Sequence, residues 1–131
     1  MDARDFITVG MSAERLLTVP FEHTVRHFLP AMPAVFATPM MILEMESAAC
    51  DAVNPHLAEG WVTVGTEVNV RHLAATPVGH VVRTTARVIE VARRVIRFEV
   101  EAFDGDRCIG AGQHGRGLVN TADFEVRFGV S

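Results

Sequence analysis

Residues 38–53 carry the spacing of apolar and polar positions that is typical of a helix. Thr38 is a good N-cap, because its hydroxyl can accept a hydrogen bond from an amide of the first turn, and Pro39 suits the first helical position. The fourteen residues that follow contain neither glycine nor proline, and Asn54-Pro55 ends the run. The sequence therefore predicts a helix over 38–53 that begins at a Thr38 cap.

The polar residues of this helix fall on two different sides. At about 100° per residue, Glu44, Ser47 and Asp51 share one narrow stripe, whereas Glu46 lies nearly opposite, among apolar side chains. In an amphipathic helix the polar stripe faces solvent. We therefore expect Glu44 to be exposed and Glu46 to point into the core.

Beyond Trp61 the apolar positions change to a period of two, which is typical of β-strands. Four strands are predicted, over 62–72, 82–88, 96–102 and 107–119. A turn at 74–79 separates the first two, and Asp104-Gly105 is a strong signal for a tight hairpin before the last. One face of the first of these strands is expected to carry Val62, Val64, Thr66, Val68, Val70 and His72.

The chain ahead of the helix is less regular. Apolar side chains at Leu17, Val19 and Phe21 predict a first strand, and Pro20 restricts it to a sheet edge or a strand end. Residues 1–10 are interpreted as a loose arm, and the C-terminal tail shows no clear pattern.

One strand, one long helix and four further strands predict an α+β domain. The helix has too wide an apolar surface to lie on the outside, so we expect an antiparallel sheet of about five strands to curl around it, which is the hot-dog fold. Such a fold leaves a long sheet edge exposed, and pairing with a second copy as a homodimer is expected. The length fits a single domain over 1–131.

Composition narrows the class of protein. Although 49% of the residues are hydrophobic, no apolar run approaches the roughly 20 residues of a membrane span. The net charge of −4 argues against a general nucleic-acid binder, and Cys50 and Cys108 form no metal or redox motif. The N-terminus lacks the features of a signal peptide, so we expect a cytoplasmic protein without membrane or nucleic-acid partners.

Two ionisable residues occupy faces that are expected to be apolar, Glu46 on the helix and His72 on the strand. A carboxylate and an imidazole suit general base catalysis or attack on an acyl carbon. Thr38 adds a hydroxyl at the helix N-terminus, where free amides favour a carbonyl oxygen that gains negative charge. Because Thr38 and Glu46 are separated by about 12 Å along a straight helix, they reach the same small group only across a dimer or through a bent first turn.

Each of these residues also has a purely structural explanation. Glu46 can satisfy a local amide network, His72 can be a structural histidine, and Thr38 can serve only as the cap. His23 and His27 have helical spacing, but the following Pro30 limits a helix there and no third ligand is apparent, so no metal site is predicted.

Four segments of the chain resemble the family of fluoroacetyl-CoA thioesterase and its hot-dog relatives. They are Thr24-Val25-Arg26-His27, Val35-Phe36-Ala37-Thr38, Glu46 with Ala49-Cys50, and His72-Leu73-Ala74-Ala75-Thr76-Pro77. The match covers roughly residues 20 to 120 in unbroken order. The resemblance implies that Thr38, Glu46 and His72 form the catalytic set and that Gly65 lines the acyl site.

The chain departs from the fluoroacetyl-specific enzyme in its lid. Only residues 29–34 precede Val35, so the longer, phenylalanine-bearing lid of that enzyme is shortened here, and Pro39 replaces a small glycine. The resemblance therefore implies thioesterase chemistry without fluoroacetate selectivity. The nearest apolar residues that can line the mouth of the pocket are Met32, Phe36 and Met40.

We expect the protein to hydrolyse a short or small acyl-CoA thioester to the free acid and CoA, without a metal or other cofactor. One alternative is a non-catalytic protein that binds acyl-CoA or another small ligand. Another is a hydratase-like enzyme of the same fold, although such relatives use an aspartate–histidine pair near the helix start, and Thr38-Pro39-Met40-Met41 offers neither residue.

Overall fold

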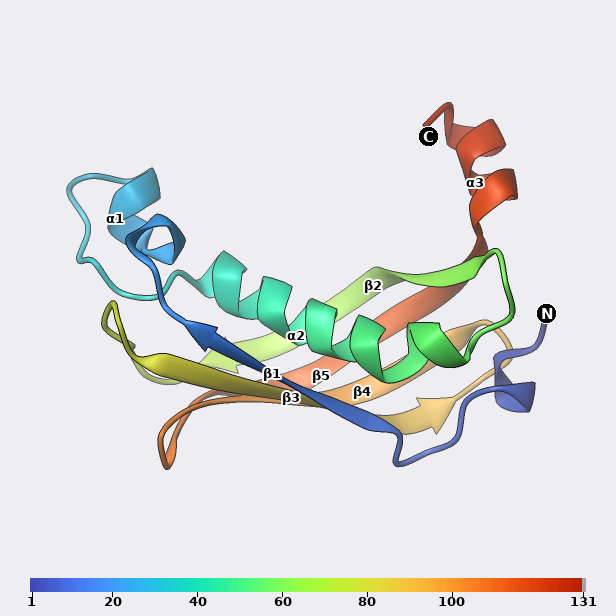
Figure 1. The fold of residues 1–131 in the computed structure, drawn as a ribbon, viewed down its shortest axis with the longest axis horizontal. Coiled ribbons are helices and arrows are strands. Elements are labelled where there is room, and N and C mark those ends of the chain that lie inside the picture. The colour runs from blue at the N-terminus through green and yellow to red at the C-terminus, as the bar shows by residue number, and fades with distance from the viewer. Residues whose placement is uncertain (131) are drawn as a thin grey trace.

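A five-stranded antiparallel sheet supports one long helix in the computed structural model, which describes residues 1–130 (Figure 1). The strands are β1 (Ser12–Thr18), β2 (Trp61–His72), β3 (Val81–Val91), β4 (Val95–Asp104) and β5 (Arg107–Asn120). Their order across the sheet is β1-β3-β4-β5-β2, and the helix α2 (Thr38–Val53) lies lengthwise across one face. This is the predicted α+β arrangement; residue 131, the last of the predicted domain, lies outside the described residues.

Shorter elements connect and flank these parts. They are η1 (Ala3–Asp5), η2 (Phe21–His23), α1 (Val25–Phe28), η3 (Asn54–His56) and α3 (Thr121–Phe128). Figure 1 shows α1 and α3 at opposite ends of α2, on the same side of the sheet as α2. Within residues 1–130, no helix is long and apolar enough to cross a membrane.

The core lies between α2 and the middle of the sheet. Every second side chain is buried from Val82 to Val88 in β3 and from Ile96 to Ala102 in β4, namely Val82, Thr84, Ala86, Val88, Ile96, Phe98, Val100 and Ala102. From the helix, Met41, Met45, Ala48 and Ala52 are buried against them. The period of two in these strands is confirmed, and so is the hairpin, in which Gly105 has the positive φ of 59° that a tight turn requires.

The N-terminal part of the chain differs from the prediction in two ways. β1 begins at Ser12 and ends before Pro20, so it lies earlier than predicted, but it is an edge strand as expected. Residues 1–10 are not a loose arm, because Ala3 and Ile7 are buried and the Ala3 amide donates a hydrogen bond to the Arg93 carbonyl at 2.9 Å. Such short buried anchors leave no periodic pattern in a sequence.

The start of α2 also differs from the prediction. The helix spans Thr38–Val53 as expected, but Ala37 is the N-cap and provides no side-chain hydrogen bond. Thr38 is the first helical residue, and its hydroxyl bonds His72 instead of a helix amide. The threonine is therefore free for a role other than capping.

The two glutamates of α2 lie in places opposite to those predicted. Glu44 is buried, with 7% of its surface exposed, because Arg15 of β1 donates a hydrogen bond to its Oε2 at 2.7 Å. Glu46 is half-buried and contacts β5 on the other flank of the helix. The central buried stripe contains Met41 and Met45, so the glutamates flank the core on its two sides and neither points into its centre.

A β-bulge divides β2 into two segments. Gly65 pairs with Arg116 and Glu67 pairs with Gly115, so Thr66 is an extra residue without a partner in β5. Thr63 and Gly65 face α2 before the bulge, whereas Val68 and His72 face it afterwards. The predicted face that runs unbroken from Val62 to His72 is therefore wrong, because the alternation shifts by one residue at Thr66.

Candidate active site

Thr38 and His72 form a pair at the start of α2. The Thr38 Oγ1 atom lies 2.7 Å from His72 Nδ1, which joins the first turn of the helix to the end of β2. Burial lowers the pKa of His72 below its ordinary value of 6.5, so its imidazole is neutral at neutral pH. A neutral imidazole bonded to a hydroxyl is able to accept or donate a proton at its other nitrogen.

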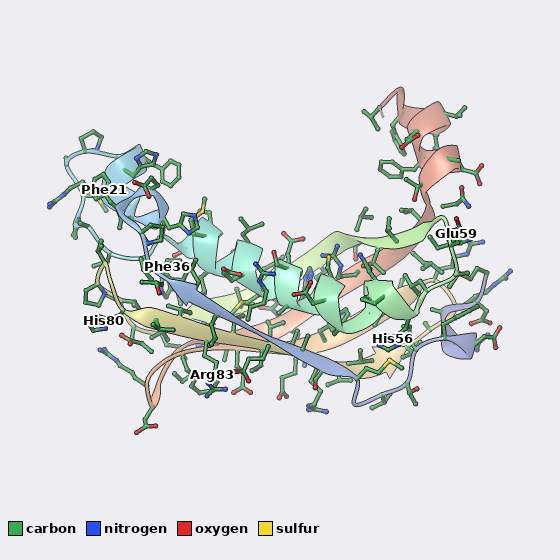
Figure 2. The ribbon with its side chains drawn as sticks, viewed as in Figure 1. Phe21, Phe36, His56, Glu59, His80 and Arg83 are labelled. Carbon is green, nitrogen blue, oxygen red and sulfur yellow. The ribbon has the colours of Figure 1, made fainter. Side chains whose placement is uncertain are left out.

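That other nitrogen, His72 Nε2, is buried and has no hydrogen-bond partner in the described part of the chain. Beside the pair lies a cavity of about 390 Å³. It is lined by Val25, Val35, Phe36, Thr38, His72, Leu73, Ala74 and Ala75. In Figure 2, Phe36 is at the beginning of α2, next to this cavity. A mostly apolar hollow that contains one hydroxyl and one imidazole suits a small acyl or thioether group.

Glu46 forms a second group with β5. Its Oε2 atom accepts a hydrogen bond from Arg116 Nη1 at 3.1 Å. The arginine side chain is 5% exposed, whereas that of Glu46 is 36% exposed. A buried guanidinium therefore holds one oxygen of a carboxylate whose remaining surface is accessible.

Arg116 is itself fixed by three further contacts. Two are with Thr63: the Arg116 Nε donates to Thr63 Oγ1 at 2.8 Å and its Nη2 donates to the Thr63 carbonyl at 2.7 Å. The Thr63 hydroxyl is held in turn by Asn54, because it donates to Asn54 Oδ1 at 2.8 Å. On the other side Arg116 Nη1 lies 3.2 Å from His114 Nε2. Because a guanidinium is planar, these contacts fix both its position and its rotation.

Gly65 provides the space that the Glu46 carboxylate occupies. A Cβ atom at this position would collide with Glu46 Oε2 and would lie 3.4 Å from both Glu46 Cδ and His114 Cε1. The Gly65 position is directly opposite Arg116 in the sheet. Gly65 is therefore part of the Glu46 group, although it does not line the cavity beside His72.

The structure places the other predicted residues differently. Phe36 is buried and lines the cavity at His72, and Met40 is half-buried against the core. Met32 is 43% exposed on the loop after α1 and does not line that cavity. The binding roles of these three residues stay predictions.

Within one chain the structure joins Thr38 to His72 and Glu46 to Arg116, but no hydrogen bond between described residues joins Glu46 to His72. One turn of helix rises about 5.4 Å, so two turns separate the two groups along α2. The chain thus carries two parts of a site, a hydroxyl–imidazole pair and a carboxylate–guanidinium pair. The catalytic roles of Thr38, Glu46 and His72 stay predictions.

Neither the geometry nor the chemistry of these groups points to a metal. Within residues 1–130, no three histidine, cysteine, aspartate or glutamate side chains are grouped so that they could hold an ion. The polar groups that meet here are suited instead to proton transfer and to the stabilisation of a negatively charged oxygen.

Comparison with known proteins identifies the family. The model of the fluoroacetyl-CoA-specific thioesterase family matches residues 19–122. The chain is also 36% identical, over 130 residues, to the fluoroacetyl-CoA thioesterase of Streptantibioticus cattleyicolor, with 95% of this chain and 94% of the relative covered. This chain belongs to the fluoroacetyl-CoA-specific thioesterase family. The resemblance inferred from four short segments is thereby confirmed.

Solved structures support membership of the fluoroacetyl-CoA-specific thioesterase family. A variant of the fluoroacetyl-CoA-specific thioesterase in complex with fluoroacetate and CoA is 37% identical, covers 90% of this chain and 99% of its own, and has a TM-score of 0.83. A hot-dog-like protein from Thermanaerovibrio acidaminovorans is 26% identical, covers 98% of this chain and 95% of its own, and has a TM-score of 0.89. The predicted hot-dog fold is confirmed, and the protein is a thioester hydrolase.

Sequence reasoning missed two residues of this thioesterase-family site, His114 and Arg116. Both are buried, on the same face of β5 as Leu118. The signal was present, because a period of two places His114 and Arg116 in line with Leu118 on the inner face of the strand. The surrounding glycines concealed it, since they interrupt the apolar pattern of the strand.

Proposed function

We propose that this protein hydrolyses small acyl-CoA thioesters to the free acid and CoA, with Glu46 as the reacting carboxylate. The observation that carries this proposal is the way Glu46 is held. Its Oε2 is bonded to a buried arginine, and its Oε1 has no hydrogen-bond partner among the described residues. A carboxylate fixed by one oxygen and free at the other is ready to attack a carbonyl carbon or to deprotonate a water.

Two routes use this free oxygen. In the first, Oε1 attacks the thioester carbon, the C–S bond breaks, and water then hydrolyses the resulting anhydride. In the second, Oε1 takes a proton from a water molecule whose oxygen attacks the same carbon. In both routes the departing CoA thiolate receives a proton, and the imidazole of His72, which lines the cavity at the end of β2, can supply it.

The two routes differ in the fate of the Glu46 oxygen. A single turnover in ¹⁸O-labelled water places the label in the Glu46 carboxylate only if an anhydride forms and water attacks its glutamyl carbonyl. Attack at the acyl carbonyl labels the acid instead, as the general base route does. Repeated turnovers followed by mass spectrometry of the peptide that contains Glu46 therefore detect the anhydride route by its accumulated label.

We further propose a homodimer formed along β2. This strand is twelve residues long, lies at the edge of the sheet, and exposes the run Gly65–Asn69. An unpaired edge of this length readily accepts a second strand. An antiparallel pairing centred near Val68-Asn69 sets Gly65 of one chain beside His72 of the other, so each complete site combines Glu46 and Arg116 of one protomer with Thr38 and His72 of its partner.

A mixing experiment tests the shared site. Glu46→Gln and His72→Ala chains are each expected to be inactive alone, because each lacks one part of every site. Co-expressed with different tags and purified as a heterodimer, they contain one complete site if the site is shared, and about half of the wild-type activity should return. If the site lies within one chain, the heterodimer has no complete site and remains inactive.

The choice of acyl group depends on the loop between α1 and α2. Residues 29–34 form a short segment in which Leu29 and Met32 are exposed. Because this segment replaces a longer lid, we propose that the pocket accepts several small acyl groups. Thiol release from acetyl-, propionyl-, butyryl- and fluoroacetyl-CoA measures this choice, and a steep preference for the fluoroacetyl ester would contradict it.

The same panel, extended by an enoyl-CoA such as crotonyl-CoA, separates the alternatives. A binding protein would hold an acyl-CoA tightly without releasing thiol faster than water does. A hydratase-like enzyme would consume an enoyl-CoA and leave the thioester intact. Release of CoA from at least one ester, lost in Glu46→Gln, supports the proposed hydrolysis over both.

A further inference from the structure

His114 is a buried imidazole next to the Glu46 group. It is 1% exposed, and its ring is stacked on Phe98 with 6.1 Å between the ring centroids. Its Cε1 atom lies close to Gly65, on the floor of the space that holds the Glu46 carboxylate. A fully buried histidine that borders a reacting carboxylate needs an explanation beyond packing.

The contacts of His114 determine which nitrogen carries the proton. Nδ1 lies 2.6 Å from the Glu67 carbonyl oxygen, which can only accept a hydrogen bond, so Nδ1 carries a proton. Nε2 lies 3.2 Å from Arg116 Nη1, which can only donate, so Nε2 presents its lone pair. Burial, with a further contribution from the Arg116 charge, lowers the pKa of His114 and keeps the ring neutral.

The ring therefore makes one hydrogen bond as a donor and one as an acceptor, and the two cannot be exchanged. It donates to the backbone of β2 and accepts from Arg116 on β5. Arg116 Nη1 has two hydrogens, and its two partners are His114 Nε2 and Glu46 Oε2. One Nη1 hydrogen is donated to the lone pair of His114 Nε2, so the second Nη1 hydrogen is directed at the Glu46 carboxylate.

We propose that His114 is a positioning residue for the reaction, which fixes the Arg116 guanidinium so that its Nη1 holds Glu46 in the reactive orientation. This role rests on the proposed function, because it acts through Glu46. It requires the acceptor at the position of Nε2, whereas the donor at Nδ1 only anchors the ring. Loss of that acceptor leaves the guanidinium held only through Nε and Nη2, so the whole planar group shifts and displaces the carboxylate that Nη1 holds.

Two amide substitutions separate these requirements. The side-chain amide of Gln reaches the position of Nε2, so His114→Gln retains an acceptor for Arg116. The amide of Asn reaches only the position of Nδ1, so His114→Asn retains the anchor to Glu67 and loses that acceptor. We expect kcat within about threefold of wild type for Gln and about 10²-fold lower for Asn, the scale of a displaced catalytic group, with KM little changed in both.

If His114 had only a structural role, kcat would not be much lower for the Asn variant than for the Gln variant. The melting temperature of each variant is measured beside kcat, and His56→Asn, an exposed histidine at the far end of α2 (Figure 2), is the matched control. Equal kcat values for the Gln and Asn variants, with similar melting temperatures, would overturn the proposal. An Asn variant with wild-type activity would overturn it as well.

A second measurement applies whether or not the variants fold. In ¹⁵N NMR spectra of the wild-type protein, the two ring nitrogens of each histidine have distinct shifts in each protonation state. We expect His114 to be a neutral ring with the proton on Nδ1 between pH 7 and 8, because burial lowers its pKa below 6.5. A ring protonated on Nε2 in this range contradicts the proposal. Wild-type protein that releases no CoA from any ester would instead contradict the proposed function, and with it the role of His114 in the reaction.

Discussion

Glu46 is the residue on which the proposed chemistry depends. Its Oε2 is held by Arg116 and its Oε1 has no partner within residues 1–130, so the two oxygens have different roles. Glu46→Gln keeps the shape of the side chain, and its amide oxygen can still accept from Arg116. We expect kcat to fall about 10²-fold or more, the scale of a lost general base, while the melting temperature stays close to wild type.

Glu44 is the matched control on the same helix. It is buried and bonded to Arg15, far from Arg116 on the other flank of α2. Glu44→Gln weakens this ion pair, so we expect a lower melting temperature with kcat nearly unchanged. If Glu44→Gln abolished turnover and Glu46→Gln did not, the site would lie on the Glu44 side of α2, and the assignment of Glu46 would be wrong.

Gly65 gives a second prediction at this scale. In Gly65→Ala the new methyl group would occupy the space of Glu46 Oε2, and it would push the carboxylate away from Arg116. We expect kcat to fall about tenfold or more through this misplacement. In Gly115→Ala, by contrast, the nearest atom to the new methyl group is Glu67 Cβ at 3.4 Å, an ordinary contact, so this variant should keep its activity.

The buried histidines predict how stability depends on pH. Burial lowers the pKa values of both His72 and His114 below 6.5, so the unfolded chain takes up protons at a higher pH than the folded protein. The contribution of these two histidines to the free energy of unfolding is therefore fully present above about pH 6.5. It decreases as the solution becomes more acidic. Urea unfolding at several pH values should show this decrease, and His114→Gln should show a smaller one, because it removes one of the two groups.

At the scale of the element, predictions from the sequence were good where contacts are local. The period of two in β3 and β4, the Asp104-Gly105 hairpin and the limits of α2 are all as expected. The helical wheel of α2 gave the correct angle between Glu44 and Glu46, but it did not show where the sheet lies. Arg15 and Arg116, both distant in sequence, determine which glutamate is covered and which remains accessible.

The start of α2 also shows that local sequence does not reveal tertiary partners. A threonine before a proline is typical of an N-cap, and the local sequence gives no reason to expect otherwise. His72 is 34 positions away in the chain, and only the folded sheet brings its ring within 2.7 Å of the Thr38 hydroxyl. The candidate residues were identified from the sequence, whereas their partners depend on tertiary contacts.

For the whole molecule, β2 is the edge strand of the sheet that lies next to both parts of the site. Val68 of this strand is 44% exposed although it lies on the inner face beside His114. In the proposed dimer it is covered by the partner, so Val68→Asp places a charge in the interface. We expect light scattering to give the mass of one chain for this variant and of two chains for wild type. Val81→Asp, at an equally exposed valine on β3, should remain a dimer.

Loss of the dimer should also remove activity, since each complete site needs both protomers. Thiol release by Val68→Asp is therefore expected to be far below wild type. A monomeric variant with full activity would contradict the shared site without affecting the assignment of Glu46.

The bulge at Thr66 determines whether β2 can serve both parts of the site. Gly65 has an odd number and His72 an even one, so a regular strand would turn one of them towards α2 and the other away. The single additional residue between them lets both face the helix. Deletion of Thr66 alone would keep every other residue in the sequence. The regular strand that results would turn either Gly65 or His72 towards α2, and never both.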